Sequence, residues 1–428
     1  MRNSDNLKLF SKAKNAYLDG NTELALRTYK KAFLKYPELR FLIKRTINLL
    51  FKNKEFDKEF KINYKIRELK KIAFYLPAVN NGGGVHSVIQ EAIAINNLNI
   101  NTKVLINEKH LRRFLNNYPN QNIEDILIPT NPSNFEESVK EFDILIGTVF
   151  SSARVVSDIS KKFPFIMPAY YIQDYEPMFY EENSSSYLEA LKSYNLNSNM
   201  ICFAKTDWIC NIVKENHNLT VNKVKPSLDK SIFNLDKILS NKKIIISAMI
   251  RPGTPRRGAT RTMNLLSAIK KKLSDDIKII IFGCKEQDKL FLKLNRDFEF
   301  ENRGILIREE VAKILKISSV FIDLSDYQAF GRTGLESMAC GCAPILPSKG
   351  GCNEYAINNL NSFLINTTEW EKYLCKIINL LTNREKLIEM QNAAIKTSFN
   401  YSTEKAAKSE LSLLTEKYKM HQLKQNII

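Results

Sequence analysis

Three arginines stand close together in a loop that is rich in glycine and proline. The segment ISAMIRPGTPRRGA (246–259) runs from an apolar stretch into this loop, which contains Arg251, Arg256 and Arg257. Prolines and glycines restrict the shape of a loop, and guanidinium groups form forked hydrogen bonds with phosphate oxygens. The pattern therefore predicts a diphosphate site after a strand, with a basic surface patch as the alternative interpretation.

A second segment, residues 323–356, places polar side chains around the expected start of a helix. Its candidate substrate contacts are Gln328, Phe330, Gly331, Arg332, Thr333 and Glu336. A helix that begins near Thr333 offers free backbone N–H groups to phosphate oxygens. Glu336, one turn later, can accept hydrogen bonds from a ribose diol, and Gln328 can contact a sugar hydroxyl. An ordinary strand–loop–helix would instead leave Glu336 buried without a partner, which is costly.

Three consecutive glycines follow the first apolar stretch of the α/β part. Gly83 and Gly84 lack a Cβ atom, so a ligand can approach the backbone closely where the next helix begins. His86 follows and could touch a phosphate or an acceptor, although a helix-capping or solvent role is favoured. The spacing is not G-x-G-x-x-G, so a nicotinamide site is not favoured, and a merely tight turn remains the alternative.

The elements that position these residues are alternating strands and helices. We expect strands at 70–78, 102–106, 125–129, 143–149 and 200–206, and a second series at 242–250, 276–284, 319–325 and 343–347. Helical patterns occupy 85–96, 261–273, 309–317 and 333–340. Apolar runs without alternation suit parallel sheets that helices cover on both faces. The sequence predicts two doubly wound domains, with ligand bound beyond the carboxyl ends of their strands.

The chain divides into four expected parts: a helical segment at 1–69, α/β domains at 70–235 and 236–405, and a helical tail at 406–428. The first forty residues have the spacing of one tetratricopeptide repeat: Ala13, Tyr17, Gly20, Ala25, Tyr29, Ala32 and Pro37. One repeat cannot bury its own face, so it needs a second pair at 38–66 or a neighbouring domain. A helical cap or spacer is favoured over peptide binding.

Composition limits the classes of protein that remain. The chain has 428 residues, of which 44% are hydrophobic and 26% charged, and its formal net charge is +18. This excludes a disordered chain and favours anionic partners, without choosing among phosphorylated ligands, acidic lipids and nucleic acid. The seven cysteines form no C-x-x-C pair, and no signal peptide or membrane span is evident. We expect a cytoplasmic protein, with contact to the inner face of the membrane left open.

The stretch from Gln328 to Gly341 resembles the C-terminal signature of GT-B glycosyltransferases in the glycogen-synthase-like retaining family. The family pattern is Glu-x-Phe-Gly, four residues, then Glu-(Ala/Ser)-Met-Ala-x-Gly, and this chain reads QAFGRTGLESMACG. Gly350 to Glu354 is similar to the family's Gly-Gly-x-x-Glu. The resemblance spans about 70–400 and implies two Rossmann-like domains, a nucleotide-sugar donor and a substrate contact for Glu354.

A closer likeness involves YIQDYEPMFY (171–180) together with RPGTPRRG (251–258). These motifs resemble the rhamnosyltransferase-like branch that builds bacterial surface glycans. The likeness implies transfer of rhamnose or another hexose to a polysaccharide or a lipid-linked glycan. It implies a substrate contact for Gln173, and it implies that Asp174 and Glu176 orient acceptor hydroxyls, with an ordinary polar loop as the alternative.

The resemblance also implies a mechanism. Arg251 and Arg257 would stabilise charge on the departing diphosphate, and no metal or other cofactor is expected. The family retains anomeric configuration, whereas Asp174 acting as a base would fit an inverting reaction. Gln328 departs from the family's acidic residue, which leaves a non-catalytic nucleotide-sugar-binding scaffold as the alternative. Nucleic-acid binding is not favoured, because no basic and aromatic reader motif is present.

Overall fold

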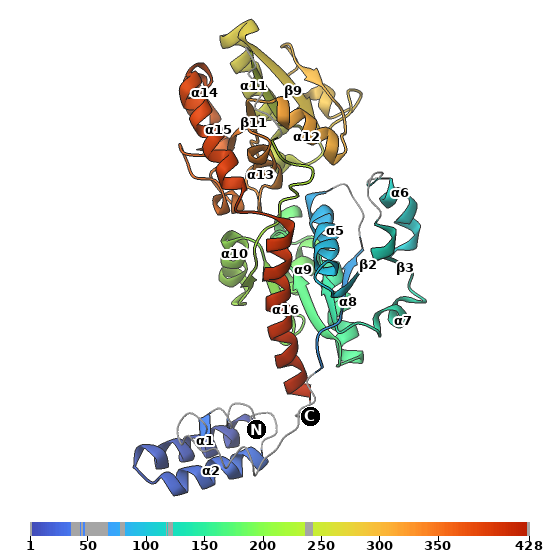
Figure 1. Ribbon diagram of the computed structural model, residues 1–428, viewed down its shortest axis with the longest axis vertical. Helices are drawn as coiled ribbons and strands as arrows, with labels where there is room; N and C mark the ends of the chain where they lie inside the picture. The colour runs from blue at the N-terminus through green and yellow to red at the C-terminus, as the bar shows by residue number, and fades with distance from the viewer. Residues whose placement is uncertain are drawn as a thin grey trace.

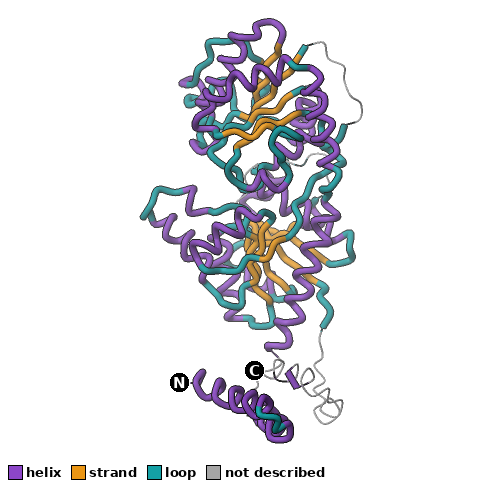
Figure 2. The backbone as a smooth tube through the Cα atoms, turned by 90° about the vertical axis from the view of Figure 1, so that its left-hand side faces the viewer, coloured by secondary structure: helices purple, strands orange, loops and turns teal. Residues whose placement is uncertain are grey.

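The structure of the protein is a computed structural model, which describes residues 2–35, 43, 46–47, 67–77, 82–116, 118, 123–235 and 243–425. Two α/β domains lie one above the other, and a pair of helices lies at the end of the molecule where the last helix finishes (Figure 1). In each α/β domain, helices cover both faces of a central sheet (Figure 2). The predicted fold class, two Rossmann-like domains of the GT-B type preceded by a helical segment, is confirmed.

The N-terminal domain contains a seven-stranded parallel sheet in the order β3-β2-β1-β4-β5-β6-β7. Its strands are β1 (Lys71–Leu76), β2 (Asn101–Asn107), β3 (Leu127–Thr130), β4 (Ile144–Gly147), β5 (Met167–Tyr171), β6 (Ile201–Ala204) and β7 (Asn222–Lys223). The helices between them are α5 (Gly83–Asn96), α6 (Leu111–Leu115), α7 (Phe135–Val139), α8 (Phe150–Lys162), α9 (Ser185–Lys192) and α10 (Asp207–His217). The strand order reverses between β1 and β4, and a crevice opens at such a point.

The C-terminal domain contains a six-stranded parallel sheet in the order β10-β9-β8-β11-β12-β13. Its strands are β8 (Ile244–Met249), β9 (Ile277–Phe282), β10 (Glu301–Asn302), β11 (Val320–Ile322), β12 (Ala343–Pro347) and β13 (Phe363–Ile365). Its helices are α11 (Ala259–Leu273), α12 (Arg308–Ile317), α13 (Arg332–Ala339), α14 (Leu374–Thr382) and α15 (Arg384–Ser398). Here the order reverses between β8 and β11, which carry the two segments singled out in the sequence.

Strand β5 is missing from the sequence prediction, although all five of its residues are buried. The reason is Pro168, which cannot donate a backbone hydrogen bond and therefore argues against a central strand. Pro168 nevertheless pairs in register with Leu145 of β4. The short strands β7, β10 and β13 are also missing, because two or three residues are too few to give a pattern.

The expected tail at 406–428 is part of a longer helix, α16 (Thr403–Gln425), which leaves the C-terminal domain and runs along the N-terminal domain (Figure 1). Ala407, Leu414 and Tyr418 join the same apolar core as α5 and β1. The buried Lys205 and Glu91 form an ion pair in this region. The last helix therefore ties the two domains together.

The N-terminal segment contains α1 (Arg2–Leu18) and α2 (Thr22–Lys35), which pack against each other. Gly20 connects them with a φ of 78°, and Ala13, Ala25, Tyr29 and Ala32 are buried. Small residues at these positions let the helices approach closely, as the spacing predicts. The expected second pair at 38–66 lies outside the described residues, so a tetratricopeptide-like repeat remains a prediction.

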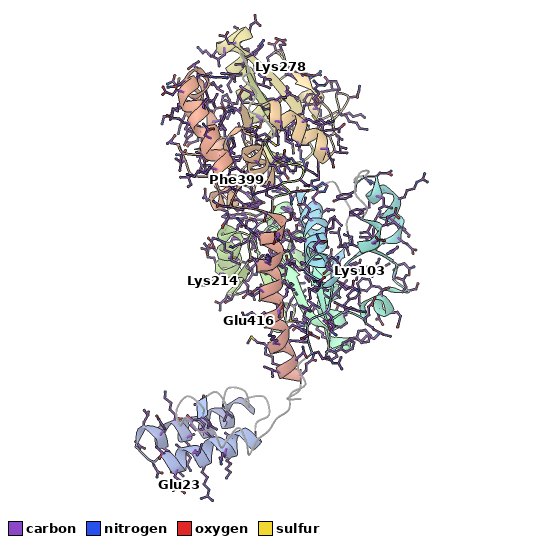
Figure 3. The ribbon with its side chains drawn as sticks, viewed as in Figure 1. Glu23, Lys103, Lys214, Lys278, Phe399 and Glu416 are labelled. Atoms are coloured by element: carbon purple, nitrogen blue, oxygen red, sulfur yellow. The ribbon has the colours of Figure 1, made fainter. Side chains whose placement is uncertain are left out.

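Charged side chains cover the outside of both domains, as Lys103, Lys214, Lys278 and Glu416 show in Figure 3. Phe399 is an exposed apolar exception, near the place where α15 gives way to α16 (Figure 3). Within the part of the chain that the structure describes, no helix has the length and apolar character that crossing a membrane requires.

Candidate functional site

A cleft of about 660 Å³, measured with its open mouth, lies between the two domains. Gly83 and His86 line it from the N-terminal domain, and the loops that follow β8 and β11 line it from the C-terminal domain. The residues contributed by the C-terminal domain include Arg251, Arg308, Arg332, Thr333 and Glu336. The cleft thus sits where the strand order of each sheet reverses, as the sequence predicts for a ligand site.

Arg251 and Arg257 lie near each other in the loop after β8. Neither guanidinium forms an ion pair or a hydrogen bond with any of the described residues. Burial lowers the pKa of both arginines, and each is lowered further by neighbouring guanidinium groups, while the Asp323 carboxylate opposes the shift. Buried charges without partners are costly, so this pair is suited to an anion with several oxygen atoms.

The shape of this loop depends on Gly258, where a short 3₁₀ turn (Pro255–Arg257) passes into α11. Gly258 has a φ of 63°, and a Cβ atom there would lie 2.1 Å from the carbonyl oxygen of Leu324. The loop after β8 therefore packs directly on the loop after β11. Glycine at this position brings the arginine loop against the start of the second segment.

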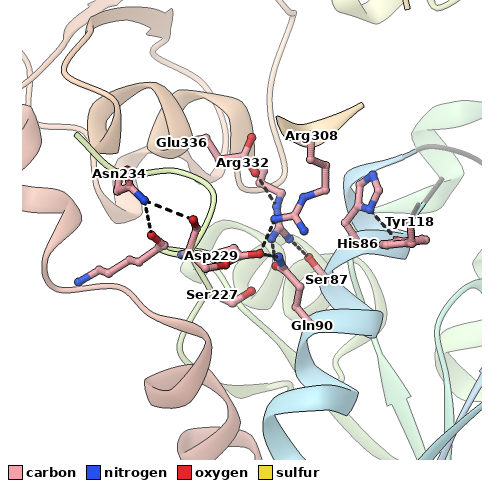
Figure 4. A network of polar contacts seen from close by, with 12 residues as sticks. His86, Ser87, Gln90, Tyr118, Ser227, Asp229, Asn234, Arg308, Arg332 and Glu336 are labelled. Atoms are coloured by element: carbon pink, nitrogen blue, oxygen red, sulfur yellow. Dashed lines mark hydrogen bonds and ion pairs between the residues drawn. The ribbon is translucent and has the colours of Figure 1, made fainter. Parts of the chain in front are cut away.

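A polar network joins the domains across the cleft (Figure 4). Arg332 donates from Nη1 to Ser87 Oγ at 2.6 Å, from Nη2 to Gln90, and from Nε to Glu336 Oε1 at 2.9 Å. Gln90 Nε2 donates to Asp229 Oδ2 at 2.7 Å. Ser87 and Gln90 belong to α5, so Arg332 fixes this helix against the C-terminal domain.

Arg308 belongs to the same network. Its Nη2 donates to Asp229 Oδ2 at 3.0 Å, while its Nη1 is buried and has no hydrogen-bond partner. Its guanidinium also lies 5.5 Å from the centre of the Phe233 ring. Arg308 is therefore partly committed to the domain contact and keeps one donor available in the cleft.

Glu336 reaches the cleft, as expected, and Arg332 already occupies one of its oxygens. The other oxygen remains available for a hydroxyl group. Thr333 also lines the cleft, in the first turn of α13. The structure therefore brings Thr333, Glu336 and Arg251 together in the lining of one cleft.

The glycine turn faces both the C-terminal domain and β5. A Cβ atom on Gly83 would lie 3.6 Å from Arg332, and one on Gly84 would lie 2.7 Å from the Gln173 Oε1 atom. Gln173 Nε2 donates to the carbonyl of Thr148 at 3.2 Å. The turn is tight, and Gln173, which was expected to bind substrate, lies directly behind it.

His86 lies at the edge of the cleft, with its Nδ1 2.6 Å from the hydroxyl of Tyr118 (Figure 4). Burial lowers the pKa of His86 to about 3, and Arg308, Arg332 and Arg251 lower it as well. The imidazole is neutral at physiological pH, so it can exchange hydrogen bonds with a ligand without adding charge.

Asp174 and Glu176 are two residues apart and have different surroundings. Asp174 Oδ2 lies 3.4 Å from Arg256 Nη2, and burial raises the pKa of Asp174 against the opposing effect of Arg256 and Arg257. Asp174 thus meets the C-terminal domain near the arginine loop.

Glu176, expected on the acceptor side, points into the N-terminal domain. It accepts hydrogen bonds from the backbone N–H of Phe150, at 3.0 and 3.2 Å, and from the Tyr170 hydroxyl at 3.2 Å. Burial raises the pKa of Glu176 to about 7, although these hydrogen bonds oppose the shift. Phe150 is the first residue of α8, so this carboxyl caps a helix.

Gln328 is buried against Asp323 instead of lying open in the cleft. Its Nε2 donates to Asp323 Oδ2 at 2.6 Å and to Ser325 Oγ at 3.1 Å. Asp323 is also the carboxylate that faces Arg251 and Arg257. A negative charge is therefore present beside position 328, although the residue at 328 is neutral.

Three other expected contacts have structural partners. Phe330 packs edge-to-face on Tyr355 at 5.4 Å, and the Gly331 carbonyl accepts from the Tyr355 hydroxyl at 2.5 Å. Glu354 accepts from the backbone N–H of Asp207 at 2.6 Å and pairs with Lys223 at 2.9 Å. These partners of Glu354 belong to the N-terminal domain, so the structure places Glu354 in the domain contact and not in the lining of the cleft.

Sequence reasoning did not single out Asp323, Arg308, Ser87 or Gln90, and it named Arg256 only as a member of the basic loop. Arg308 and Arg332 are the first residues of α12 and α13. A positive charge at a helix N-terminus opposes the helix dipole, so arginine at this position is a signal that the chain needs it for another purpose. Nothing comparable marks Ser87 and Gln90, which are ordinary polar residues on a helix.

Residues 231–397, which make up most of the C-terminal domain, match the family described as glycosyl transferases group 1. A curated relative, the N-acetyl-alpha-D-glucosaminyl L-malate synthase of Bacillus anthracis, is 26% identical over 132 residues. That match covers 30% of this chain and 35% of the relative, so it spans about a third of the relative's length.

Solved structures resemble the chain over both α/β domains. Anabaena Alr3699/HepE in complex with UDP and glucose has a TM-score of 0.66 at 14% identity, and covers 81% of this chain and 100% of its own. The pneumococcal O-GlcNAc transferase GtfA, in complex with UDP and GlcNAc, has a TM-score of 0.65 at 11% identity, and the match covers 82% of this chain and 99% of GtfA. TarM has a TM-score of 0.66 at 12% identity, and the match covers 82% of this chain and 99% of TarM. At these low sequence identities, the similarity shows a shared fold.

Proposed function

We propose that this chain, whose C-terminal domain carries the glycosyl transferases group 1 pattern, transfers a sugar from a nucleoside diphosphate sugar to a glycan acceptor. The observation that supports this most strongly is the pair Arg251 and Arg257, two partly buried cations without side-chain partners among the described residues, of which Arg251 lines the inter-domain cleft. A diphosphate supplies the missing negative charge. UDP is a reasonable first probe, because HepE and GtfA were each solved in complex with it.

The barrier to sugar transfer falls when charge on the departing diphosphate is stabilised. Arg251 and Arg257 would supply positive charge there, and the first turn of α13 at Thr333 would add backbone N–H groups. Glu336 would accept hydrogen bonds from the ribose through its available oxygen. We assign the charge stabilisation to these groups, without a metal ion.

The bond from the anomeric carbon to the diphosphate oxygen breaks, and an acceptor oxygen bonds to that carbon. In the retaining reaction that the motif favours, the proton of the acceptor hydroxyl goes to the departing phosphate. The alternative is an inverting reaction in which Asp174 takes the proton, for which its raised pKa is suitable. Product stereochemistry, read by NMR, distinguishes the two.

Rhamnose or another hexose is the proposed sugar, and a bacterial surface polysaccharide or a lipid-linked glycan is the proposed product. These choices rest on the likeness of 171–180 and 251–258 to the rhamnosyltransferase-like branch. Association with the inner face of the membrane belongs to the same proposal, and the net charge of +18 supports it.

The test is a thermal-shift series with UDP, dTDP and GDP and their sugars, followed by an assay of donor hydrolysis. A ligand that binds only the folded state raises the unfolding temperature. We expect one nucleotide to stabilise the wild-type protein and to lose this effect in Arg257→Ala. If no nucleotide stabilises the wild-type protein, the proposal is wrong.

A second candidate, a scaffold that binds the donor without turnover, is favoured by one observation: Gln328 uses its amide on Asp323 and Ser325. A protein that binds a donor, yet neither hydrolyses nor transfers its sugar with any acceptor tried, would support this candidate.

A further inference from the structure

Three consecutive apolar side chains stand exposed on the N-terminal domain beside the arginine loop. Met178, Phe179 and Tyr180, which we call the aromatic shelf, are 40%, 41% and 37% exposed. Phe179 ends a short 3₁₀ turn (Glu176–Phe179) that follows β5. Neighbouring large apolar side chains on a surface usually mark a binding site, because isolated exposure is common but grouped exposure is not.

The shelf is held in place beside the arginine loop. The Arg256 guanidinium lies 4.4 Å from the centre of the Phe179 ring and 5.3 Å from that of Tyr327, and it is paired with Asp174 at 3.4 Å. Tyr180 packs edge-to-face on Phe150 at 5.8 Å. Phe179 and Asp174 therefore share Arg256 as a neighbour, and Asp174 is itself within electrostatic range of Arg257.

The surroundings of the shelf favour a neutral ligand. Glu181 and Glu182 follow it directly and are exposed. Two carboxylates beside an apolar surface repel the head groups of an anionic membrane. An aromatic ring with an acid beside it suits a sugar, because the C–H groups of one pyranose face pack on the negative face of a ring and the hydroxyls bond to the acid.

We propose that the aromatic shelf and Asp174 form the acceptor site, and that the acceptor presents a neutral pyranose sugar there. The sugar packs on Phe179 and Tyr180, and its nucleophilic hydroxyl lies at Asp174, toward the diphosphate arginines. This inference rests on the proposed glycosyltransferase function, whose donor it leaves unspecified.

The test measures acceptor binding apart from donor binding. Saturation-transfer NMR is recorded with methyl α-D-glucopyranoside, methyl α-L-rhamnopyranoside and cellobiose, with UDP present. The variants are Phe179→Ala and Tyr180→Ala, and the second is needed because Phe179 also supports Arg256. The matched control is Phe165→Ala, since Phe165 is 48% exposed but lies just before β5, at the opposite end of the sheet from the cleft.

We expect at least one saccharide to bind the wild-type protein and Phe165→Ala, and to bind both shelf variants about tenfold more weakly, with UDP stabilisation unchanged in Tyr180→Ala. The proposal is overturned if the wild-type protein binds UDP but none of the saccharides, or if both shelf variants bind them normally. It is also overturned if the protein sediments with phosphatidylglycerol vesicles and Tyr180→Ala does not. Absence of UDP binding by the wild-type protein would instead overturn the donor function.

Discussion

Two pairs of arginines lie in or beside the cleft, and they differ in the partners that the protein gives them. Arg251 and Arg257, in the loop after β8, have no ion-pair or hydrogen-bond partner among the described residues. Arg308 and Arg332, at the starts of two helices, reach across the cleft to Asp229, Ser87 and Gln90. All four are at least partly buried, so burial does not explain the difference.

What distinguishes the pairs is the source of the compensating charge. The protein supplies it for Arg308 and Arg332, through Asp229 and Glu336, and so these two hold the domains together. For Arg251 and Arg257, the nearby Asp323 carboxylate only reduces the shift in pKa. A ligand must supply the remaining negative charge. An arginine without a protein partner therefore indicates a binding site, whereas an arginine with one indicates a structural role.

The largest expected effect comes from removing the unpartnered pair. In Arg251→Ala/Arg257→Ala, affinity for UDP should fall about 100- to 10,000-fold, because each lost hydrogen bond to a charged group is worth about 1.5–3 kcal/mol. The unliganded protein should unfold at the same temperature or a higher one, since two crowded cations are gone. Calorimetric titration and thermal unfolding measure both quantities.

The control for this change is Arg303→Ala, because Arg303 is half-exposed and pairs with Glu301 on the surface of the same domain. It should leave UDP affinity within about twofold. Wild-type affinity in the double variant would show that the unpartnered arginines do not mark a site.

The second effect concerns the partnered pair. Arg332→Ala removes three hydrogen bonds and leaves Glu336 without its cation, which should cost about 3 kcal/mol of stability even without ligand. The thermal midpoint should fall by about 5 °C or more. Small-angle scattering should report a larger radius of gyration, because α5 is released from the C-terminal domain.

A matched double variant sharpens this result. Arg332→Ala/Glu336→Gln should recover part of the lost stability, because the uncompensated carboxylate is then neutral. If Arg332→Ala unfolds at the wild-type temperature, Arg332 is not a structural link and the contrast between the pairs fails.

The smallest effect is a dependence on pH that arises from the burial of His86 and, to a smaller extent, from Arg308, Arg332 and Arg251 around it. Its pKa of about 3 in the folded protein lies below the ordinary 6.5. As the pH falls below 6.5, His86 binds a proton in the unfolded chain but not in the folded protein. The free energy of unfolding of the wild-type protein therefore decreases progressively toward pH 3. His86→Gln should therefore gain about 2 kcal/mol relative to wild type between pH 7.5 and 5.0, measured by urea unfolding.

His110→Gln is the control for the histidine change, because His110 is exposed at the end of a short 3₁₀ turn. It should show no such gain at pH 5.0. A gain in His110→Gln equal to that in His86→Gln would mean that burial and the arginines do not set the proton affinity of His86.

Much of the framework was predictable from sequence. Apolar runs gave β1, β2, β8 and β9 nearly to their ends, and glycine and proline marked the loops that follow β1 and β8. Strand β5 was not predicted, because it contains Pro168, and proline cannot donate a backbone hydrogen bond and is rare in central strands. The partners of Glu176 and Glu354 could not be predicted either, because the sequence does not show whether a carboxylate contacts a ligand or caps a helix.

By itself, the sequence determined which residues follow which strands, and hence that Arg251, Arg257, Thr333 and Glu336 meet at one edge of a parallel sheet. Local rules suffice for that, because strand ends and helix starts depend on neighbours in the chain. Only the tertiary structure decided which arginines have partners. Arg332 and Ser87 are 245 residues apart, and their contact exists only because two separately folded domains bring α13 against α5.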